Sequence, residues 1–212
     1  MDFYRETLSI ENRQRLQYSR LWSTAKTVLC TPIFIINATC SALAYSCVIL
    51  YMVVTPFLYQ HVLGLSAIEY GWLSIFNAGA ISIGSFINGG LVMRLGTKCM
   101  LRSGIYLLLA GAIAMLILFY LGQVKLLLIL LPMLFVFSGV AFISANTMAG
   151  AIEPFAKTAG IASALYGVFI VLMSGLVSFI AQLLYEKTQL PLALALLLIA
   201  IIIFLIHHWG RG

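Results

Sequence analysis

Two uninterrupted apolar runs decide the fold of this chain: LLLILLPMLFVF at residues 126–137 and LPLALALLLIAIIIFLI at residues 190–206. The 212 residues are 63% hydrophobic and only 8% charged, whereas a soluble domain carries about 25% charged residues. Because backbone groups in lipid must find their hydrogen-bond partners within the same segment, long apolar runs become helices. Short strands of alternating polarity, typical of a membrane barrel, do not occur in the pattern. The sequence therefore predicts an all-α integral membrane protein.

Further stretches of the same character bring the number of predicted membrane crossings to six. The hydrocarbon core of a bilayer is about 30 Å thick and needs roughly 20 apolar residues for each helical crossing. The predicted crossings are residues 30–55, 70–92, 103–122, 126–148, 159–184 and 189–206. Since the connections are short, successive helices should be antiparallel neighbours. We expect residues 29–212 to form a six-helix transmembrane domain.

The basic residues fall unequally on the two sides of this predicted bundle. Ten of the twelve lie on the side that holds both termini, and only Lys125 and Lys187 lie on the other. Cytoplasmic segments carry the excess of lysine and arginine, so both termini are predicted to be cytoplasmic. This topology also accounts for the net charge of +6. A nucleic-acid partner is therefore not expected.

Residues 1–28 differ in kind from the rest of the chain and form a predicted cytoplasmic linker. Apolar residues recur at helical spacing toward its end, which predicts an amphipathic helix lying on the membrane surface. These residues are Tyr18, Leu21, Trp22, Ala25 and Val28, followed by Leu29. A solvated linker with a helical tendency is the alternative interpretation.

Small residues recur every three or four positions in the second and fifth crossings. The first stripe consists of Gly71, Ser74, Ala78, Ser82, Ser85 and Gly89. The second consists of Gly160, Ala164, Gly167, Val171, Ser174, Gly175 and Ser178. Such stripes let neighbouring helices approach closely in a membrane. We therefore expect them to be helix-packing surfaces and expect leucine at Gly167 to disrupt the packing of the fifth crossing.

The polar residues indicate neither an enzyme nor a metal or cofactor site. No histidine or carboxylate is predicted at mid-membrane depth, and the four cysteines lack the spacing of metal ligands. Uncharged polar and aromatic groups do occur at that depth, and each can line a substrate cavity or bond to a neighbouring helix. The candidates are Tyr45, Asn77, Asn146 and Tyr166.

Two motifs carry a resemblance to a known family. The first runs from Ser144-Ala145-Asn146 to AGIASALYG at residues 159–167, and it resembles the tenth and eleventh helices of bicyclomycin-resistance-type drug:proton antiporters of the major facilitator superfamily. The second, GGLVMRLGTK at residues 89–98, is similar to the cytoplasmic loop motif of that superfamily. Its matching positions include Gly89, Arg94, Gly96 and Lys98, while Met93 replaces the acidic residue.

This resemblance implies the C-terminal half of a twelve-helix multidrug exporter in a bacterial inner membrane. A further feature, Glu6-Thr7-Leu8 followed by Arg13 and Arg15, resembles the start of the cytoplasmic linker that joins the two halves. The implied function is proton-coupled efflux of small amphipathic compounds, with the substrate held between this bundle and an N-terminal six-helix half or a second copy. In that family the proton-coupling carboxylates belong mainly to the N-terminal half. A non-transporting membrane scaffold, or the relic of a truncated transporter gene, is the alternative.

Overall fold

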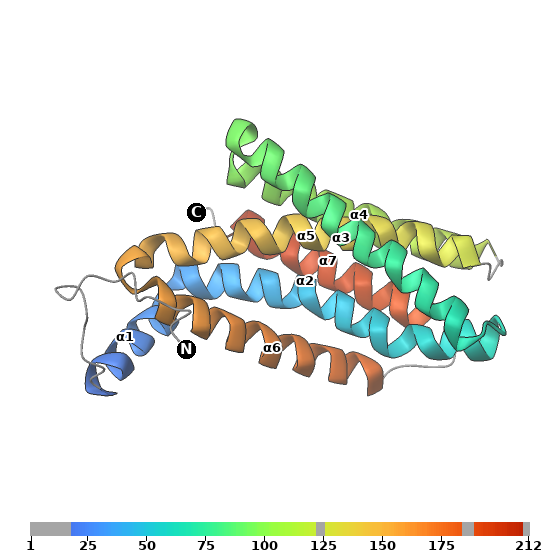
Figure 1. Cartoon of the computed structure of the whole chain (residues 1–212), viewed down its shortest axis with the longest axis horizontal. Coiled ribbons are helices and arrows are strands. Elements are labelled where there is room, and N and C mark those ends of the chain that lie inside the picture. Colours follow the sequence, from blue (N-terminus) through green and yellow to red (C-terminus); the bar gives the residue numbers. More distant parts are fainter. Residues whose placement is uncertain (1–17, 122–125, 184–188, 210–212) are drawn as a thin grey trace, which may run out of the picture.

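The computed structural model describes residues 18–121, 126–183 and 189–209, and helices build all of its architecture (Figure 1). In chain order these are α1 (Tyr18–Cys30), α2 (Pro32–Phe57), the π-helical turn η2 (Leu58–Val62), α3 (Ala67–Leu95), α4 (Thr97–Tyr120), α5 (Leu126–Ile152), the 3-10 segment η3 (Glu153–Thr158), α6 (Ala159–Leu183) and α7 (Leu190–Trp209). The described residues contain no strand, which confirms the all-α prediction.

Five segments are long and apolar enough to cross a membrane, judged by their length and composition. The segments are Pro32–Gln60, Ala67–Leu95, Thr97–Tyr120, Leu126–Leu183 and Leu190–His208. The fourth has 58 residues and contains both α5 and α6, which the kinked segment η3 joins. These segments support the prediction of a multi-pass helical membrane protein, and the count of six crossings stays a prediction.

Local sequence signals set the helix ends. Pro32 occupies the first turn of α2, where its missing N–H is not needed. Ser66 and Glu69 form a capping box at the start of α3, with the Ser66 backbone N–H donating to the Glu69 carboxylate over 2.8 Å. Helix α4 begins at Thr97, earlier than the predicted start at residue 103. The prediction was wrong there because polar residues in the first turns of α4 lower the hydropathy without interrupting the helix.

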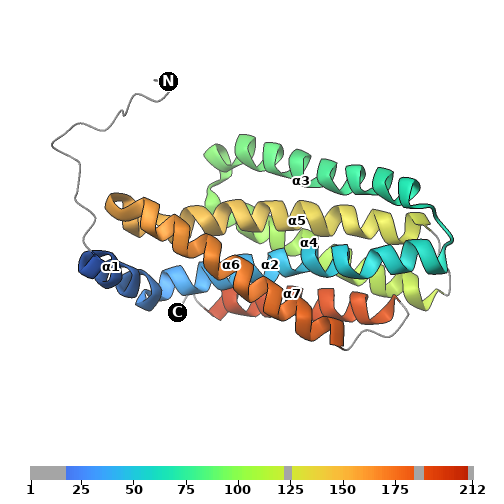
Figure 2. The same ribbon diagram turned by 60° about the horizontal axis from the view of Figure 1, so that its bottom comes forward.

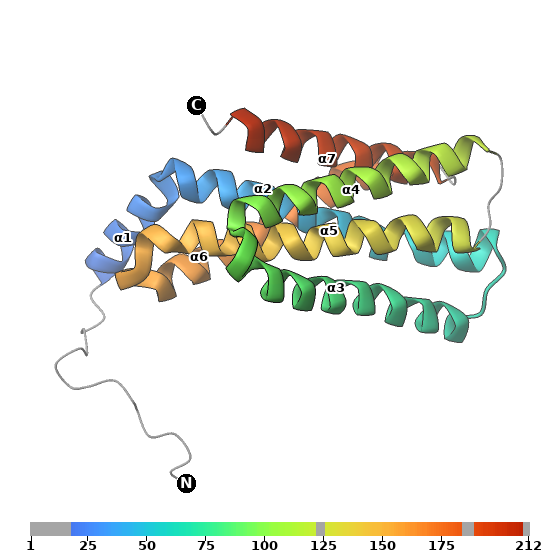
Figure 3. The same cartoon turned by 90° about the horizontal axis from the view of Figure 1, so that it is seen from above.

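The helices form a bundle with α2 and α5 at its centre. Helices α4 and α7 pack together on one side, against α5 and α2 respectively. Helix α3 packs on α5, and α6 packs on α2, on the other side. Figure 1 looks onto this second side, with α3 and α6 flanking α5 and α2, and Figure 3, seen from above, shows α4 and α7 on the opposite side of the bundle from α3. We call the side formed by α3, α5, α2 and α6 the front face.

The two sides of the bundle are packed by different chemistry. At the back, α4 and α5 approach so closely that a Cβ on Gly139 would lie 2.7 Å from the Gly104 carbonyl oxygen. Helix α7 adds apolar side chains, including the fully buried Leu196 and Ile203. Figure 2 shows α6 running obliquely along α2 at the front, where side-chain hydrogen bonds join the helices. These side-chain hydrogen bonds between helices therefore gather at the front.

Candidate functional site

Asn77 joins α3 to α2 in the interior of the bundle. Its Nδ2 donates to the Tyr51 hydroxyl over 2.7 Å, and the side chain is 4% exposed. The hydroxyls of Tyr51 and Tyr59 are 3.4 Å apart. The Oδ1 atom of Asn77 is buried and finds no hydrogen-bond partner among the described residues. Asn77 thus makes an interhelical bond and keeps one unused acceptor.

Asn146 makes the second polar contact, from α5 to α3. Its Nδ2 donates to Asn88 Oδ1 and to the Phe142 carbonyl, each over 2.7 Å. Both asparagine side chains are buried. Amide groups in a membrane interior need such partners because lipid offers none. Asn146 is therefore committed to holding α3 and α5 together.

Tyr166 closes the end of the front face at which η3 lies. Its hydroxyl is 3.1 Å from Thr147 Oγ1, which connects α6 to α5. Its ring meets that of Phe34 edge-on, with centroids 6.3 Å apart, and Phe34 meets Phe155 of η3 in the same way at 6.2 Å. The aromatic cluster of Phe34, Phe155 and Tyr166 therefore joins α2, η3 and α6.

Tyr45 is the one predicted position that remains on the surface. Its side chain is 42% exposed on α2, and no described residue hydrogen-bonds its hydroxyl. Ser46 marks the side of α2 that contacts α6, and Asn37, which lies near Gly150, marks the side that contacts α5. Tyr45 lies between these two sides of the helix. It therefore faces outward on the front face. A substrate-lining role for any of the four predicted residues stays a prediction.

The predicted cytoplasmic loop motif is almost entirely helical. Gly89 lies within α3, Arg94 in its last turn and Lys98 in the first turn of α4, so only Gly96 connects the two helices. Gly96 adopts φ +79° and ψ 158°, a conformation that favours glycine. A single residue thus connects the two helices, and the role of these positions in a cytoplasmic loop stays a prediction. Arg94 and Lys98 are both exposed at this end.

The small residues of α6 point away from the rest of the chain. A Cβ added to Gly160, Gly167 or Gly175 would find no described atom within 4 Å, and Ala164 is exposed. The same openness holds for Gly71 and Gly89 of α3. The buried residues of α6 are Ala162 and Tyr166, together with Ser174 and Ser178 of the predicted stripe. The other members of the two stripes are exposed within the described chain, so their packing role stays a prediction.

The closest helix packing uses glycines that sequence reasoning did not single out. Gly104 of α4 faces Gly139 of α5, whereas Gly111 of α4 faces Pro132 and Val136. An added Cβ at any of the three glycines would lie 2.7 Å from its nearest atom. A signal for this contact was present. Gly104, Leu108, Gly111 and Met115 recur at helical spacing, and all four are buried.

Comparison with known proteins adds no relative. No protein-family model matches this sequence, and no curated protein matches it either. The fold and its contacts define a helical bundle that is apolar enough to cross a membrane. Side-chain hydrogen bonds join its front helices, and apolar contacts and close glycines hold α4 and α7.

Proposed function

We propose that this chain is one half of a proton-coupled exporter of small amphipathic compounds, of the major facilitator type. In this proposal α2 to α7 each cross the membrane once, with η3 reversing the chain between α5 and α6. The bundle forms one wall of the substrate path and moves against a second bundle. Both termini and the basic helix ends lie in the cytoplasm of a bacterial cell.

The observation that carries the proposal is the one-sided distribution of polar contacts. The interhelical hydrogen bonds of Asn77, Asn146 and Tyr166, and that of Ser178 to the Ser46 carbonyl, all join α2, α3, α5 and α6. Apolar residues and close glycines hold α4 and α7. Polar groups in a bundle interior are costly, and they mark the side that faces a cavity or a partner more often than the side that faces lipid.

The outward small residues support a partner bundle on the front face. The stripes on α3 and α6 flank α2 and α5, and both present open space at their glycines. A second bundle can approach closely along the two stripes of small residues. Space for a substrate then remains over Tyr45, which lies between the stripes. Tyr45 supplies an aromatic ring and a free hydroxyl to an amphipathic substrate, which is the chemistry such substrates need.

The positions of the carboxylates support a proton path in the partner. In the described part of the chain the carboxylates are Glu69, in the first turn of α3, and Glu153, in η3. Both lie at helix ends, whereas intramembrane proton relays use ionisable groups at depth. The partner bundle therefore supplies the coupling carboxylate.

Accumulation of ethidium in efflux-deficient cells tests this function. The chain is expressed alone, with a candidate six-helix partner that carries a mid-membrane carboxylate, and with a variant of the partner in which alanine replaces that carboxylate. We expect ethidium accumulation to fall only when the chain is expressed with the unmodified partner. A protonophore should abolish this decrease. Ethidium accumulation equal to that of efflux-deficient cells without the chains, when both chains are inserted in the membrane, would favour a non-transporting scaffold.

A further inference from the structure

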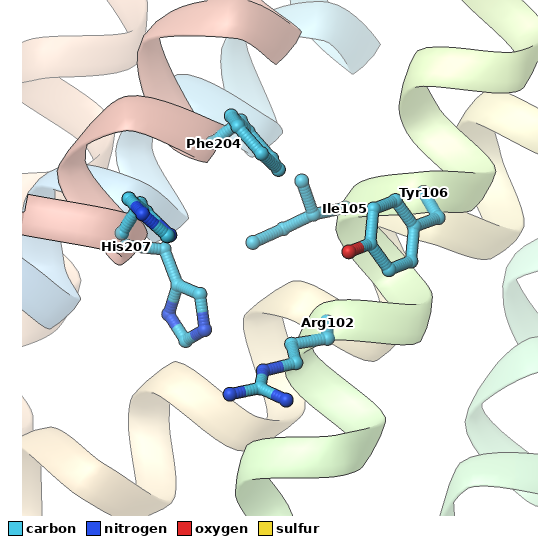
Figure 4. Close-up of a pocket in the computed structure, with 6 residues that line it drawn as sticks. Arg102, Ile105, Tyr106, Phe204 and His207 are labelled. Atoms are coloured by element: carbon cyan, nitrogen blue, oxygen red, sulfur yellow. The ribbon is translucent and has the colours of Figure 1, made fainter.

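An opening of about 400 Å³ lies between α4 and α7, away from the front face. Its lining comes from the start of α4 and the end of α7, as Figure 4 shows. The lining residues are Arg102, Ile105, Tyr106, Phe204, His207 and His208. The opening therefore sits at the end of the bundle where the α3–α4 connection and the C-terminal end of α7 meet.

The polar rim of this opening is basic. Arg102 is exposed, and the neighbouring turn of α4 carries Lys98 on the same side of the helix. Neither described carboxylate, Glu69 or Glu153, forms an ion pair with Arg102, and His207 and His208 add two imidazoles. Figure 4 shows the Arg102 guanidinium and the Tyr106 hydroxyl on the α4 side and His207 on the α7 side. Such a rim attracts an anion that has several acceptor oxygens.

The floor and outer wall of the opening are apolar. Ile105 is 1% exposed at the base, whereas Phe204 and Tyr106 present their rings outward, with centroids 6.5 Å apart. The Phe204 ring also stacks on the His208 ring, with centroids 6.1 Å apart and an interplanar angle of 5°. Aromatic rings at the end of a membrane helix lie at headgroup depth, beside the first carbons of the acyl chains. A small inorganic anion would leave these surfaces unused.

We propose that this opening between α4 and α7 binds the headgroup of an anionic phospholipid. The Arg102 guanidinium donates to the phosphate oxygens, and the Tyr106 hydroxyl and the histidines are further donors at its rim. The glycerol and upper acyl chains lie along Phe204 and Tyr106. Basic pockets between transmembrane helices are suited to such lipids because charge and apolar contact act together.

Native mass spectrometry of the full chain in detergent tests the proposal. Phosphatidylglycerol is titrated against phosphatidylcholine, and the fraction of protein carrying one lipid is measured. Arg102→Gln should weaken phosphatidylglycerol binding about tenfold, because hydrogen bonds between charged groups are the strong ones. Arg94→Gln is the matched control, since it removes the same charge from an exposed helix end outside the opening. Its effect should stay below about twofold.

Three results would overturn the proposal. Equal loss of phosphatidylglycerol binding in Arg102→Gln and Arg94→Gln would indicate that the lipid is attracted to all the basic residues at this end of the bundle and not to the opening. Equal binding of phosphatidylcholine and phosphatidylglycerol would remove the requirement for an anion. Displacement of the lipid by millimolar inorganic phosphate would identify a site for free phosphate. Arg102→Lys, which keeps the charge and the exposed position, should retain most of the binding and so exclude misfolding as the cause.

Discussion

Asn88 of α3 and Asn146 of α5 form a buried amide pair, with 2.7 Å between the Oδ1 atom of the first and the Nδ2 atom of the second. The pair matters because α3 has few buried contacts. Its buried residues are Leu73, Asn77, Gly84 and Asn88. Two of these four are asparagines bonded to other helices, so α3 is held to the bundle by polar contacts as much as by apolar packing.

This arrangement predicts measurable coupling between the two asparagines. Single replacement of either by alanine leaves the other amide buried with fewer partners, at a cost of about 1–3 kcal/mol. The double variant should lose less free energy of unfolding than the sum of the losses in the two single variants. The coupling expected from double-mutant cycles in membrane proteins is about 0.6 kcal/mol on average and about 1.7 at most. Unfolding of the four proteins by SDS in mixed micelles measures it, and strictly additive losses would show that the pair does not form.

The back of the bundle should tolerate no side chain at Gly139. Alanine there would place its Cβ 2.7 Å from the Gly104 carbonyl oxygen and 2.8 Å from the Leu108 nitrogen, and backbone atoms cannot move aside cheaply. We expect Gly139→Ala to lower the free energy of unfolding by about 1–3 kcal/mol. Gly175→Ala is the control, because the same substitution there meets open space. Equal stability of the two variants would contradict the close approach of α4 and α5.

Gly96 should be replaceable only at the cost of backbone strain. An added Cβ has room, but φ +79° is a conformation that L residues rarely adopt. Gly96→Ala should therefore destabilise the protein by about 1–3 kcal/mol. Gly90→Ala, also in open space but inside helix α3, should be neutral or stabilising by up to about 1 kcal/mol. Thermal unfolding in detergent distinguishes the two, and an unchanged Gly96→Ala protein would indicate a different connection between α3 and α4.

The exposed stripe of α6 makes a different prediction for Gly167. Leucine at this position meets no described atom of the chain, so Gly167→Leu should change the free energy of unfolding by less than about 0.5 kcal/mol. The same variant should weaken co-purification with a partner bundle or a second copy. Loss of stability in the purified chain would restore the original expectation that Gly167 packs inside the bundle.

The sequence was informative about helices because lipid leaves the backbone few alternatives. Continuous apolar runs located α5 and α7 well, and the capping box of Ser66 and Glu69 shows why α3 begins where it does. The start of α4 was missed because hydropathy detects burial in lipid, whereas a helix continues into polar turns such as that of Lys98. The presence of each helix was therefore easier to predict than the residues at which it begins and ends.

The direction in which each helix faces was harder to predict. Gly104 and Gly167 are both small residues at helical spacing, yet one touches a backbone and the other touches nothing. Composition alone does not distinguish a stripe that packs within the chain from one that remains open, because both sides of a membrane helix are apolar. The same limit applies to Tyr45 and Tyr166, of which only the second is buried.

The central claim, that the front face borders a path for substrate, is tested most directly by cysteine accessibility in the native membrane. Cysteine is placed at Tyr45 and, as a control, at Ile113, which lies near the middle of α4 as Tyr45 does in α2 and whose 45% exposure matches the 42% of Tyr45. The exposed Cys30 and Cys99 are first replaced by serine. The account predicts that a membrane-impermeant maleimide labels Tyr45→Cys and spares Ile113→Cys. Equal protection of both cysteines would contradict a water-filled path and favour a scaffold embedded in lipid.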